Sequence, residues 1–599
     1  MNTIRYACLV GASVLASGCT IINSYTNNPL VLPESTKGLP LPEAKKDERE
    51  TQKASFKVSG KRGNPDVLVL LALSGGGSRA AYFSALVMLK LQTFPDHDLL
   101  QEVDAISSVS GGSIAAAYYA ISKDERVTSP ALAALIAPLQ DKNPFPPGTL
   151  HAAGNGTLTC SKELGPSEVQ KVRDRVADPY LAARVIALCN VVSNRMWDEE
   201  TVKDLMKRNY VMRWFGNWFW PWNIGRYWFT AFDRSDLMAQ TLANNLYDAE
   251  LTTREYTFRD LTFGDLNPER PYLLINSTNA TGSDSGAISR REQFPFGSIF
   301  TFTAEDFSDR IDSDIKSYSV ARAVMASAAF PLVFPNMTLR DFSPLAEPEC
   351  KDAENTRGLC YRYLHVFDGG NSDNLGLATV KRVLFEAAAA RRFDEFKRIV
   401  VISVDAFTRP AGTSSKFSDS RVDLFSYLLD ANLVSAVDSL LQANRGNTMR
   451  EFRNRVFSWE EKECDPDQRN FPERLCKTLR ELKATAPLDK KAPFDKEGQL
   501  NLKDKLVFYH IGFDDVGNAE FMEMGADGNI VSMRLRERLD QIPTSLSISD
   551  ADANVIEKAV QSIVKPGNDC LRAIREIVTN SYVNPTDPHE RCRAVDLPR

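Results

Sequence analysis

The order of apolar segments along the chain predicts an α/β fold, in which helices cover a layered sheet. A continuous apolar run at residues 67–73 has the length of a buried parallel strand. A glycine cluster follows it, and residues 80–91 then have helical periodicity. Residues 106–120 repeat this order with a second strand, a turn and a helix.

Three further apolar segments extend the predicted sheet, at residues 272–276, 364–367 and 399–404. Residues 407–420 are polar and rich in Pro, Gly and Ser, which predicts a boundary after a sheet domain of residues 66–406. A chain of 599 residues is long enough for more than one lobe. Residues 407–599 have amphipathic helical patterns and one strand (506–511), so we expect a mostly helical C-terminal region of unknown role.

A Trp-rich insertion interrupts the predicted sheet domain at about residues 140–265. Five of the seven tryptophans lie between residues 214 and 228, with Phe and Tyr among them. Aromatic side chains at this density are typical of membrane interfaces. The alternative is a small aromatic core beneath a long loop. Arg and Asn interrupt the run, which favours an interfacial segment over a membrane-spanning helix.

The N-terminus has the pattern of an export signal. Residues 1–18 combine a short positive start with an apolar stretch that is too short to span a bilayer. Small residues before Cys19 resemble the bacterial lipobox, although Leu15 lies one place further from the cysteine than that pattern prefers. Cys19 is therefore the predicted lipidation site, with residues 19–65 as a tether. An ordinary cleaved signal is the alternative.

Thr20, which follows the predicted lipidation site, resembles the residue found in lipoproteins sorted to the outer membrane. We therefore expect a lipid-anchored protein of the outer membrane, on a face that the sequence does not specify. Without the lipid, a secreted or periplasmic protein is the alternative. The net charge of −6 gives no support for nucleic-acid binding.

Eight cysteines remain when Cys8, in the signal, and Cys19 are set aside. An even number in an exported protein implies disulfides, whose connectivity spacing alone cannot determine. The simplest hypothesis joins neighbours: Cys160–Cys189, Cys350–Cys360, Cys464–Cys476 and Cys570–Cys592. A metal site is the weaker alternative, because there is no Cys-x-x-Cys and the five histidines are scattered.

Ser110 lies where the second predicted strand turns into its helix, in the sequence Ser108-Val109-Ser110-Gly111-Gly112. Small residues are needed at a sharp strand–turn–helix junction, because strand and helix pack closely there. The N-terminus of the helix favours negative charge beside the serine. This pattern predicts acyl transfer with Ser110 as the nucleophile.

The glycine cluster after the first strand predicts the oxyanion hole. Gly75, Gly76 and Gly77 leave backbone N–H groups free to approach an oxyanion, and Arg79 adds positive charge. The same residues fit the Gly-x-Gly-x-x-Ala dinucleotide fingerprint. That alternative requires an acidic residue at the end of the next strand, and two serines stand there instead.

The predicted general base is Asp368, because no histidine is suitably placed for a Ser-His-Asp triad. His365 lies within a predicted strand, and the others lie in polar loops or outside the predicted sheet domain: His97, His151, His510 and His589. Asp368 follows the strand at 364–367, so we expect its carboxylate at the same sheet edge as Ser110. The alternative is a turn in which Asp368 only caps the backbone.

These three motifs, Gly-Gly-Gly-Ser-Arg at 75–79, Ser-x-Ser-Gly-Gly at 108–112 and Asp-Gly-Gly at 368–370, together resemble the patatin-like phospholipase family. Two further segments match it: YLLINSTNAT at 272–281 is similar to its central strand, and AVMASAAFPLVFP at 323–335 to its Ala-Ser-x-Ala-x-Pro segment. The resemblance covers residues 66–406 without the Trp-rich insertion. It implies a three-layer α/β/α fold.

The resemblance also implies a Ser-Asp dyad, with Ser110 as nucleophile, Asp368 as base, and Gly75, Gly76, Gly77 and Arg79 as the oxyanion loop. It implies no metal and no cofactor. We expect a serine acyl hydrolase of phospholipase A or lipase type, acting through an acyl-enzyme on phospholipid or another lipid ester at a membrane surface, in lipid metabolism of the cell envelope. Ser108 and Ala80 replace glycines of the family pattern. A catalytically inactive envelope lipoprotein that acts through protein contacts is therefore the alternative.

Overall fold

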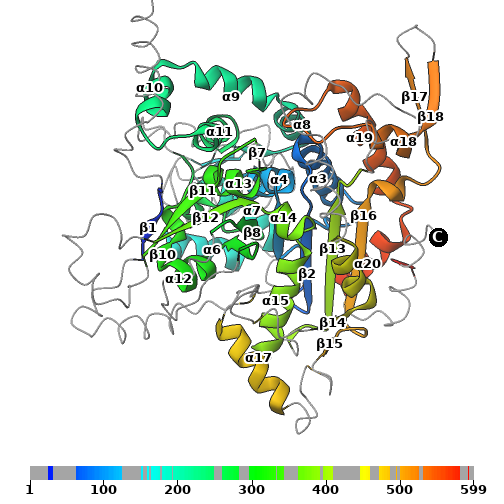
Figure 1. Ribbon diagram of the computed structural model, residues 1–599. Helices are drawn as coiled ribbons and strands as arrows, with labels where there is room; N and C mark the ends of the chain where they lie inside the picture. Colours follow the sequence, from blue (N-terminus) through cyan, green and yellow to red (C-terminus); the bar gives the residue numbers. More distant parts are fainter. Residues whose placement is uncertain are drawn as a thin grey trace, which may run out of the picture.

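The computed structural model places a central sheet between two layers of helices (Figure 1). It describes residues 25–30, 63–124, 150–152, 158–160, 164–175, 179–191, 193, 195–247, 260–281, 296–331, 333–342, 362–390, 395–408, 445–458, 464, 471, 473–485, 494, 499–524, 530–580 and 591–592. The predicted signal and Cys19 lie outside these ranges, as do residues 424–441, which have one of the amphipathic patterns expected in the C-terminal region.

Among the described residues, eight strands form the central sheet, in the order β11-β12-β8-β3-β2-β13-β16 with β9 beside β8. Their bounds are β2 Val67–Leu73, β3 Ala105–Val109, β8 Tyr272–Asn279, β9 Ile299–Phe302, β11 Met337–Asp341, β12 Arg362–Asp368, β13 Arg398–Asp405 and β16 Leu506–Gly512. The five strands from β8 to β16 are parallel, whereas β9, β11 and β12 pair in the antiparallel sense. Every strand predicted between residues 67 and 404 lies in this sheet.

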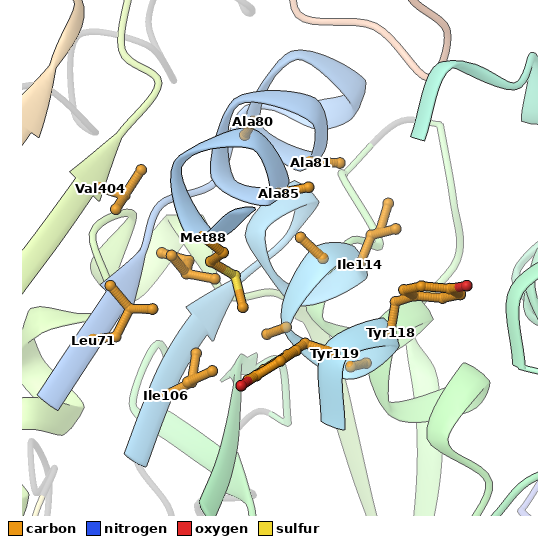
Figure 2. Close-up of a cluster of buried hydrophobic side chains, with 14 of the residues drawn as sticks. Leu71, Ala80, Ala81, Ala85, Met88, Ile106, Ile114, Tyr118, Tyr119 and Val404 are labelled. Atoms are coloured by element: carbon orange, nitrogen blue, oxygen red, sulfur yellow. The ribbon is translucent and has the colours of Figure 1, made fainter. Parts of the chain in front are cut away.

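The alternation of side chains along β2 explains the three layers. Successive strand residues point to opposite faces, and β2 is apolar and buried throughout, so it has a core on each side. Residues 67, 69, 71 and 73 join the core with α3 (Gly77–Gln92) and α4 (Gly111–Ile121). Figure 2 shows this core, with Leu71 and Ile106 of the sheet facing Met88 of α3. Residues 68, 70 and 72 join the opposite core with α15 (Leu377–Ala389).

Further helices extend both layers. On the side of α3 and α4 lie α8, α11, α13 and α19, and α17 packs against α15. The remaining helices are α6 Pro166–Arg175, α7 Pro179–Asn190, α8 Glu199–Lys207, α9 Tyr210–Trp218, α10 Pro221–Phe229, α11 Arg234–Leu242, α12 Ala304–Ile311, α13 Val320–Ser327, α14 Gly370–Asp373, α17 Glu473–Thr485, α18 Leu535–Asp540, α19 Asp550–Ile563 and α20 Asp569–Asn580. Within the described residues, no helix is long and apolar enough to cross a membrane.

In the part of the chain that the structure describes, short strands outside the main sheet form five two-stranded pairs. They are β1 Asn28–Pro29 with β10 Ser313–Asp314, β4 Lys123–Asp124 with β7 Met196–Trp197, β5 Leu150–Ala152 with β6 Leu158–Cys160, β14 Val456–Ser458 with β15 Gln499–Asn501, and β17 Glu520–Met524 with β18 Ile530–Arg534. The first pair shows that part of the predicted tether is ordered: Asn27 is buried and donates to Ser313 Oγ.

The C-terminal region contributes strand β16 to the same sheet, contrary to the boundary expected at residue 406. β16 pairs with β13 along its whole length, and all seven of its residues are buried. α19 packs on α3, where the Tyr82 hydroxyl donates to the Glu557 carboxylate. A polar loop marks a domain boundary only when no later strand returns to the sheet, and β16 does return.

Two of the four hypothesised disulfides are confirmed. Cys464–Cys476 and Cys570–Cys592 have Cα–Cα distances of 5.5 and 4.5 Å. Cys189 is also disulfide-bonded. The side chain of its expected partner Cys160, and the pair Cys350–Cys360, lie outside the described residues.

Candidate active site

Ser110 lies at the turn between β3 and α4 with φ 50° and ψ −119°. A positive φ is strained in a residue other than glycine, and such strain is typical of a nucleophile elbow. The glycines that follow make the turn possible. A Cβ on Gly111 would lie 2.0 Å from the carbonyl oxygen of Gly77, and one on Gly112 would lie 2.7 Å from that of Leu73.

The structure brings Ser110 and Asp368 together. Ser110 Oγ donates a hydrogen bond to Asp368 Oδ2 over 3.1 Å, and both residues are buried. The other carboxylate oxygen, Oδ1, accepts the N–H of Gly370 at 2.8 Å. Asp368 therefore contacts the serine directly, and is not only a cap of its own turn.

Asp368 reaches the serine by an unexpected route, because β12 runs antiparallel to β8. Only the last three residues of β12 pair with β8, and Asp368 lies opposite Ser277. Since Val109 pairs with the adjacent Asn276, the end of β12 meets the carboxyl end of β3 from the opposite direction. Gly369 permits this crossing, because a Cβ there would lie 2.3 Å from the carbonyl oxygen of Asn276.

Burial raises the pKa of Asp368 to about 6, against a lowering by the hydrogen bonds from Gly370 and Ser110. An unperturbed aspartate has a pKa near 4 and is a poor base for a hydroxyl. A pKa closer to neutrality makes a carboxylate a better proton acceptor, while it is still ionised at pH 7.

This pKa gives a pH dependence that can be measured. Only the ionised carboxylate accepts the serine proton, so kcat/KM for a soluble ester should rise about tenfold per pH unit below pH 6 and level off above it. A stopped assay across pH 4.5–8 on a substrate without ionisable groups measures this profile. A plateau that already extends down to pH 4.5 would contradict a buried Asp368 acting as the base.

The predicted oxyanion loop lies against the serine. A Cβ on Gly75 would lie 3.2 Å from the Ser110 Cβ. The N–H of Gly75 donates to the carbonyl of Asn374, and that of Ser78 to the carbonyl of Ser545. Within the described part of the chain, the amides of Gly76 and Gly77 make no hydrogen bond. These two amides are the ones available to an oxyanion, and both glycines have positive φ.

Arg79 has a different position from the one predicted. Its Nε donates to the carbonyl of Ala406 at 3.0 Å, and its Nη1 to that of Ile542 at 2.7 Å. The guanidinium thus joins the glycine loop to the end of β13 and to the C-terminal segment. We therefore assign Arg79 to positioning the loop and not to binding the oxyanion.

Sequence reasoning gave no role to Ser327, which supports the elbow. Its Oγ accepts the backbone N–H of Ser110 at 2.9 Å and donates to the carbonyl of Asn276 at 2.6 Å. Ser113 Oγ lies 3.0 Å from Ser327 Oγ. It also donates a hydrogen bond to the hydroxyl of Ser108, one of the two residues that replace a family glycine. The signal for Ser327 was its place in the matched Ala-Ser-x-Ala segment.

His510 was predicted outside the sheet domain, and that prediction is wrong. It lies in β16, buried, with Nε2 3.2 Å from a carboxylate oxygen of Asp405. Three strand spacings separate β16 from β3, about 14 Å, so His510 cannot serve Ser110. His365 lies in β12 as expected, beside Thr338, and burial lowers its pKa.

In the described ranges, no group of three or more His, Cys, Asp and Glu side chains could hold a metal ion. The dinucleotide alternative lacks the acidic residue that it requires. The β3 end, where a dinucleotide site requires an acidic residue, has Ser107 and Ser108, whose hydroxyls donate to the carbonyls of Gly376 and Leu274.

Fold and site together define a class: a layered α/β protein with a serine on a strained strand–helix turn and a buried carboxylate as its hydrogen-bond partner. Residues 71–381, more than half of the chain, match the family model described as patatin-like phospholipase. The chain therefore belongs to the patatin-like phospholipase family, a family of lipid hydrolases.

Comparison with solved structures finds fourteen matching chains, and the two described here have low sequence identity to this one. Human GIVD cytosolic phospholipase A2 is 11% identical with a TM-score of 0.31, over 94% of this chain and 67% of that one. VipD from Legionella pneumophila is 13% identical with a TM-score of 0.21, over 87% of this chain and 77% of that one. Both TM-scores are below 0.5, so the assignment rests on the family model. No curated protein matches the chain by sequence.

Proposed function

We propose that the protein is a serine acyl hydrolase of phospholipase A or lipase type that cleaves lipid esters with a Ser110–Asp368 dyad. The observation that carries the proposal is the 3.1 Å hydrogen bond from Ser110 Oγ to the buried Asp368 carboxylate, at a strained turn. A serine with only a structural role needs neither a strained turn nor a buried carboxylate. A nucleophile needs both, because the turn exposes its hydroxyl to the substrate and the carboxylate accepts its proton.

In the first step, Asp368 accepts the Ser110 proton while Oγ forms a bond to the ester carbonyl carbon. The carbonyl oxygen becomes an oxyanion, which the amides of Gly76 and Gly77 would stabilise. When the carbon–oxygen bond to the alcohol breaks, the protonated Asp368 gives its proton to the leaving oxygen. The products of this step are a free alcohol and an acyl-enzyme on Ser110.

In the second step, a water molecule attacks the acyl-enzyme and gives a proton to Asp368. The bond between Ser110 Oγ and the acyl carbon breaks, and the proton returns to the serine. A fatty acid is released and the dyad is restored. Each step needs Asp368 to gain and lose one proton, which suits a pKa of about 6.

The test is product analysis together with covalent labelling. Purified protein incubated with phosphatidylethanolamine should release fatty acid and lysophospholipid, and a fluorophosphonate should label Ser110, identified by peptide mass spectrometry. Absence of both released fatty acid and a Ser110 adduct would refute the hydrolase and favour the inactive lipoprotein.

We also propose that the protein is anchored in the outer membrane through lipid on Cys19, on the basis of the N-terminal pattern alone. Mass spectrometry of the mature N-terminus should find an acylated Cys19. Cys19→Ala should move the protein from salt-washed membranes to the soluble fraction. An unmodified Cys19 would leave a secreted or periplasmic protein.

A further inference from the structure

Within the Trp-rich insertion, helices α9 and α10 follow each other and are joined at Phe219 and Trp220. We call residues 210–229 the aromatic arm; Figure 1 shows it at the upper edge of the molecule, next to α11. One face is built into the fold. The Trp214 ring is buried and packs on Phe334 at 5.5 Å, and Asn217 donates to Thr241 of α11. Aromatic packing of the kind expected in the alternative, a small aromatic core, is therefore present on this face.

The other face is exposed and apolar. The described residues include eleven exposed large hydrophobic side chains, and eight of them lie on the arm: Met212, Phe215, Phe219, Trp220, Trp222, Ile224, Trp228 and Phe229. Trp222 is 78% exposed and Phe219 73%. Soluble surfaces rarely gather apolar side chains in this way, so the concentration marks a binding surface.

The charges on the arm have one sign. Between residues 209 and 232 the sequence contains Arg213 and Arg226 and no acidic residue, in a chain whose net charge is −6. Arg226 lies over the Phe232 ring at 4.0 Å, and Arg213 donates to the Asn245 side chain. Arg226 also interacts electrostatically with Asp260. Among the described residues Arg213 has no carboxylate within ion-pair distance, so this part of the arm is complementary to an anionic surface.

We propose that the aromatic arm binds an anionic lipid surface, inserting Phe219, Trp220 and Trp222 at the headgroup level. The proposal rests on the proposed function for its lipid substrate. Indole rings favour the membrane interface, because the ring is buried while the N–H stays hydrated. Short amphipathic helices with arginine beside aromatic residues bind in the same way.

A second copy of the chain is a poorer occupant. In a twofold contact the same surface meets itself, so Arg213 and Arg226 would approach like charges, and the arm offers no acidic residue to pair with them. An anionic bilayer has no such conflict.

The test compares two sets of exposed substitutions in a Ser110→Ala background, which leaves the vesicles intact. The arm variant is Phe219→Ser/Trp220→Ser/Trp222→Ser. The control is Met522→Ser/Ile530→Ser, on the β17–β18 hairpin at the other side of Figure 1, whose side chains are each 71% exposed. Partition into phosphatidylcholine–phosphatidylglycerol vesicles should weaken at least roughly tenfold for the arm variant and stay unchanged for the control.

Three further measurements test this inference, and the first of them separates it from the proposed function. With Ser110 intact, the arm variant should hydrolyse a soluble ester at the wild-type rate, so loss of binding is not loss of chemistry. Arg213→Gln should weaken binding about fivefold on anionic vesicles and not on phosphatidylcholine alone. Brominated lipids should quench the fluorescence of the parent protein more than that of the arm variant.

Equal partition of the arm variant and its parent would overturn the inference, whether or not the protein is an enzyme. A second result would also overturn it: the parent protein is a dimer without lipid, whereas the arm variant is a monomer that binds vesicles as well as the parent does. The arm would then join two copies of the chain. If the protein bound vesicles but had no hydrolase activity, the proposed function would be refuted, whereas the inference that the aromatic arm binds lipid would still hold.

Discussion

Ser110→Ala should lower ester turnover by at least about a thousandfold, because it removes the atom that forms the acyl-enzyme. The remaining rate reflects substrate binding and the amides of Gly76 and Gly77, which the substitution leaves in place. Initial rates with a fluorogenic short-chain ester, at enzyme concentrations set by active-site labelling of the wild type, measure the effect.

The fold should be unchanged by this substitution. Alanine has the same Cβ as serine, so the backbone strain at φ 50° is the same in both, and the Ser110 amide still donates to Ser327. Circular dichroism and the unfolding midpoint should therefore match those of the wild type closely.

A buried serine elsewhere in the fold provides the control. Ser84 lies in α3, fully buried, and its Oγ has no hydrogen-bond partner among the described residues. Ser84→Ala should keep full turnover. If Ser110→Ala and Ser84→Ala were equally active, Ser110 would not be the nucleophile, and the strained turn would need another explanation.

The local part of the site could be predicted from sequence because its physics is local. Each of its parts is a contiguous segment whose residue types predict burial or a sharp turn: the apolar run at 67–73, the glycines that follow it, and the turn at Ser110. Asp368 was identified for a partly mistaken reason. The expectation that its strand ends at the sheet edge as β3 does is wrong, because β12 runs antiparallel to β8 and arrives from the opposite side.

The errors concern contacts between distant parts of the chain. Arg79 was predicted to face the oxyanion, since nothing in the neighbouring sequence shows the carbonyls of Ala406 and Ile542 that bind it. His510 and its strand were placed outside the sheet because a long polar segment precedes them. Ser327 contacts Ser110 across 217 residues, so its role depends on the packing of α13 against α4.

The glycine loop shows how these distant contacts affect the site. The Ser78 amide, which a local interpretation would count as an oxyanion donor, is bound by the carbonyl of Ser545. A Cβ on Gly77 would lie 2.2 Å from the same oxygen. The C-terminal segment thus supports the loop from behind and leaves the amides of Gly76 and Gly77 as donors, so residues after 540 are part of the site's structure.

Asp368→Asn should have two opposite effects, a loss of turnover of about 10²–10⁴-fold and a gain in stability at pH 7. Asparagine cannot accept the serine proton, although its oxygen can still accept the Gly370 N–H. In the wild type, burial raises the pKa of Asp368 from its ordinary value of 3.8 to about 6. The folded protein therefore holds this proton more tightly than the unfolded chain, and its stability falls as pH rises from about 4 to 6.

Asparagine does not ionise and so avoids this cost, which is up to about 3 kcal/mol at pH 7 and absent below pH 4. The difference in the free energy of unfolding between variant and wild type, from urea titrations at pH 4 and pH 7, isolates the contribution of Asp368 from those of all other titrating groups.

Asp373 is the matched control: it is buried, burial raises its pKa to about 6, and it accepts the N–H groups of Leu375 and Ala378. Asp373→Asn should keep turnover within about tenfold, because Asp373 does not contact Ser110. If instead both variants lost activity equally, or if Asp368→Asn were less stable than the wild type at pH 7, Asp368 would be a structural carboxylate and the serine would need a different base.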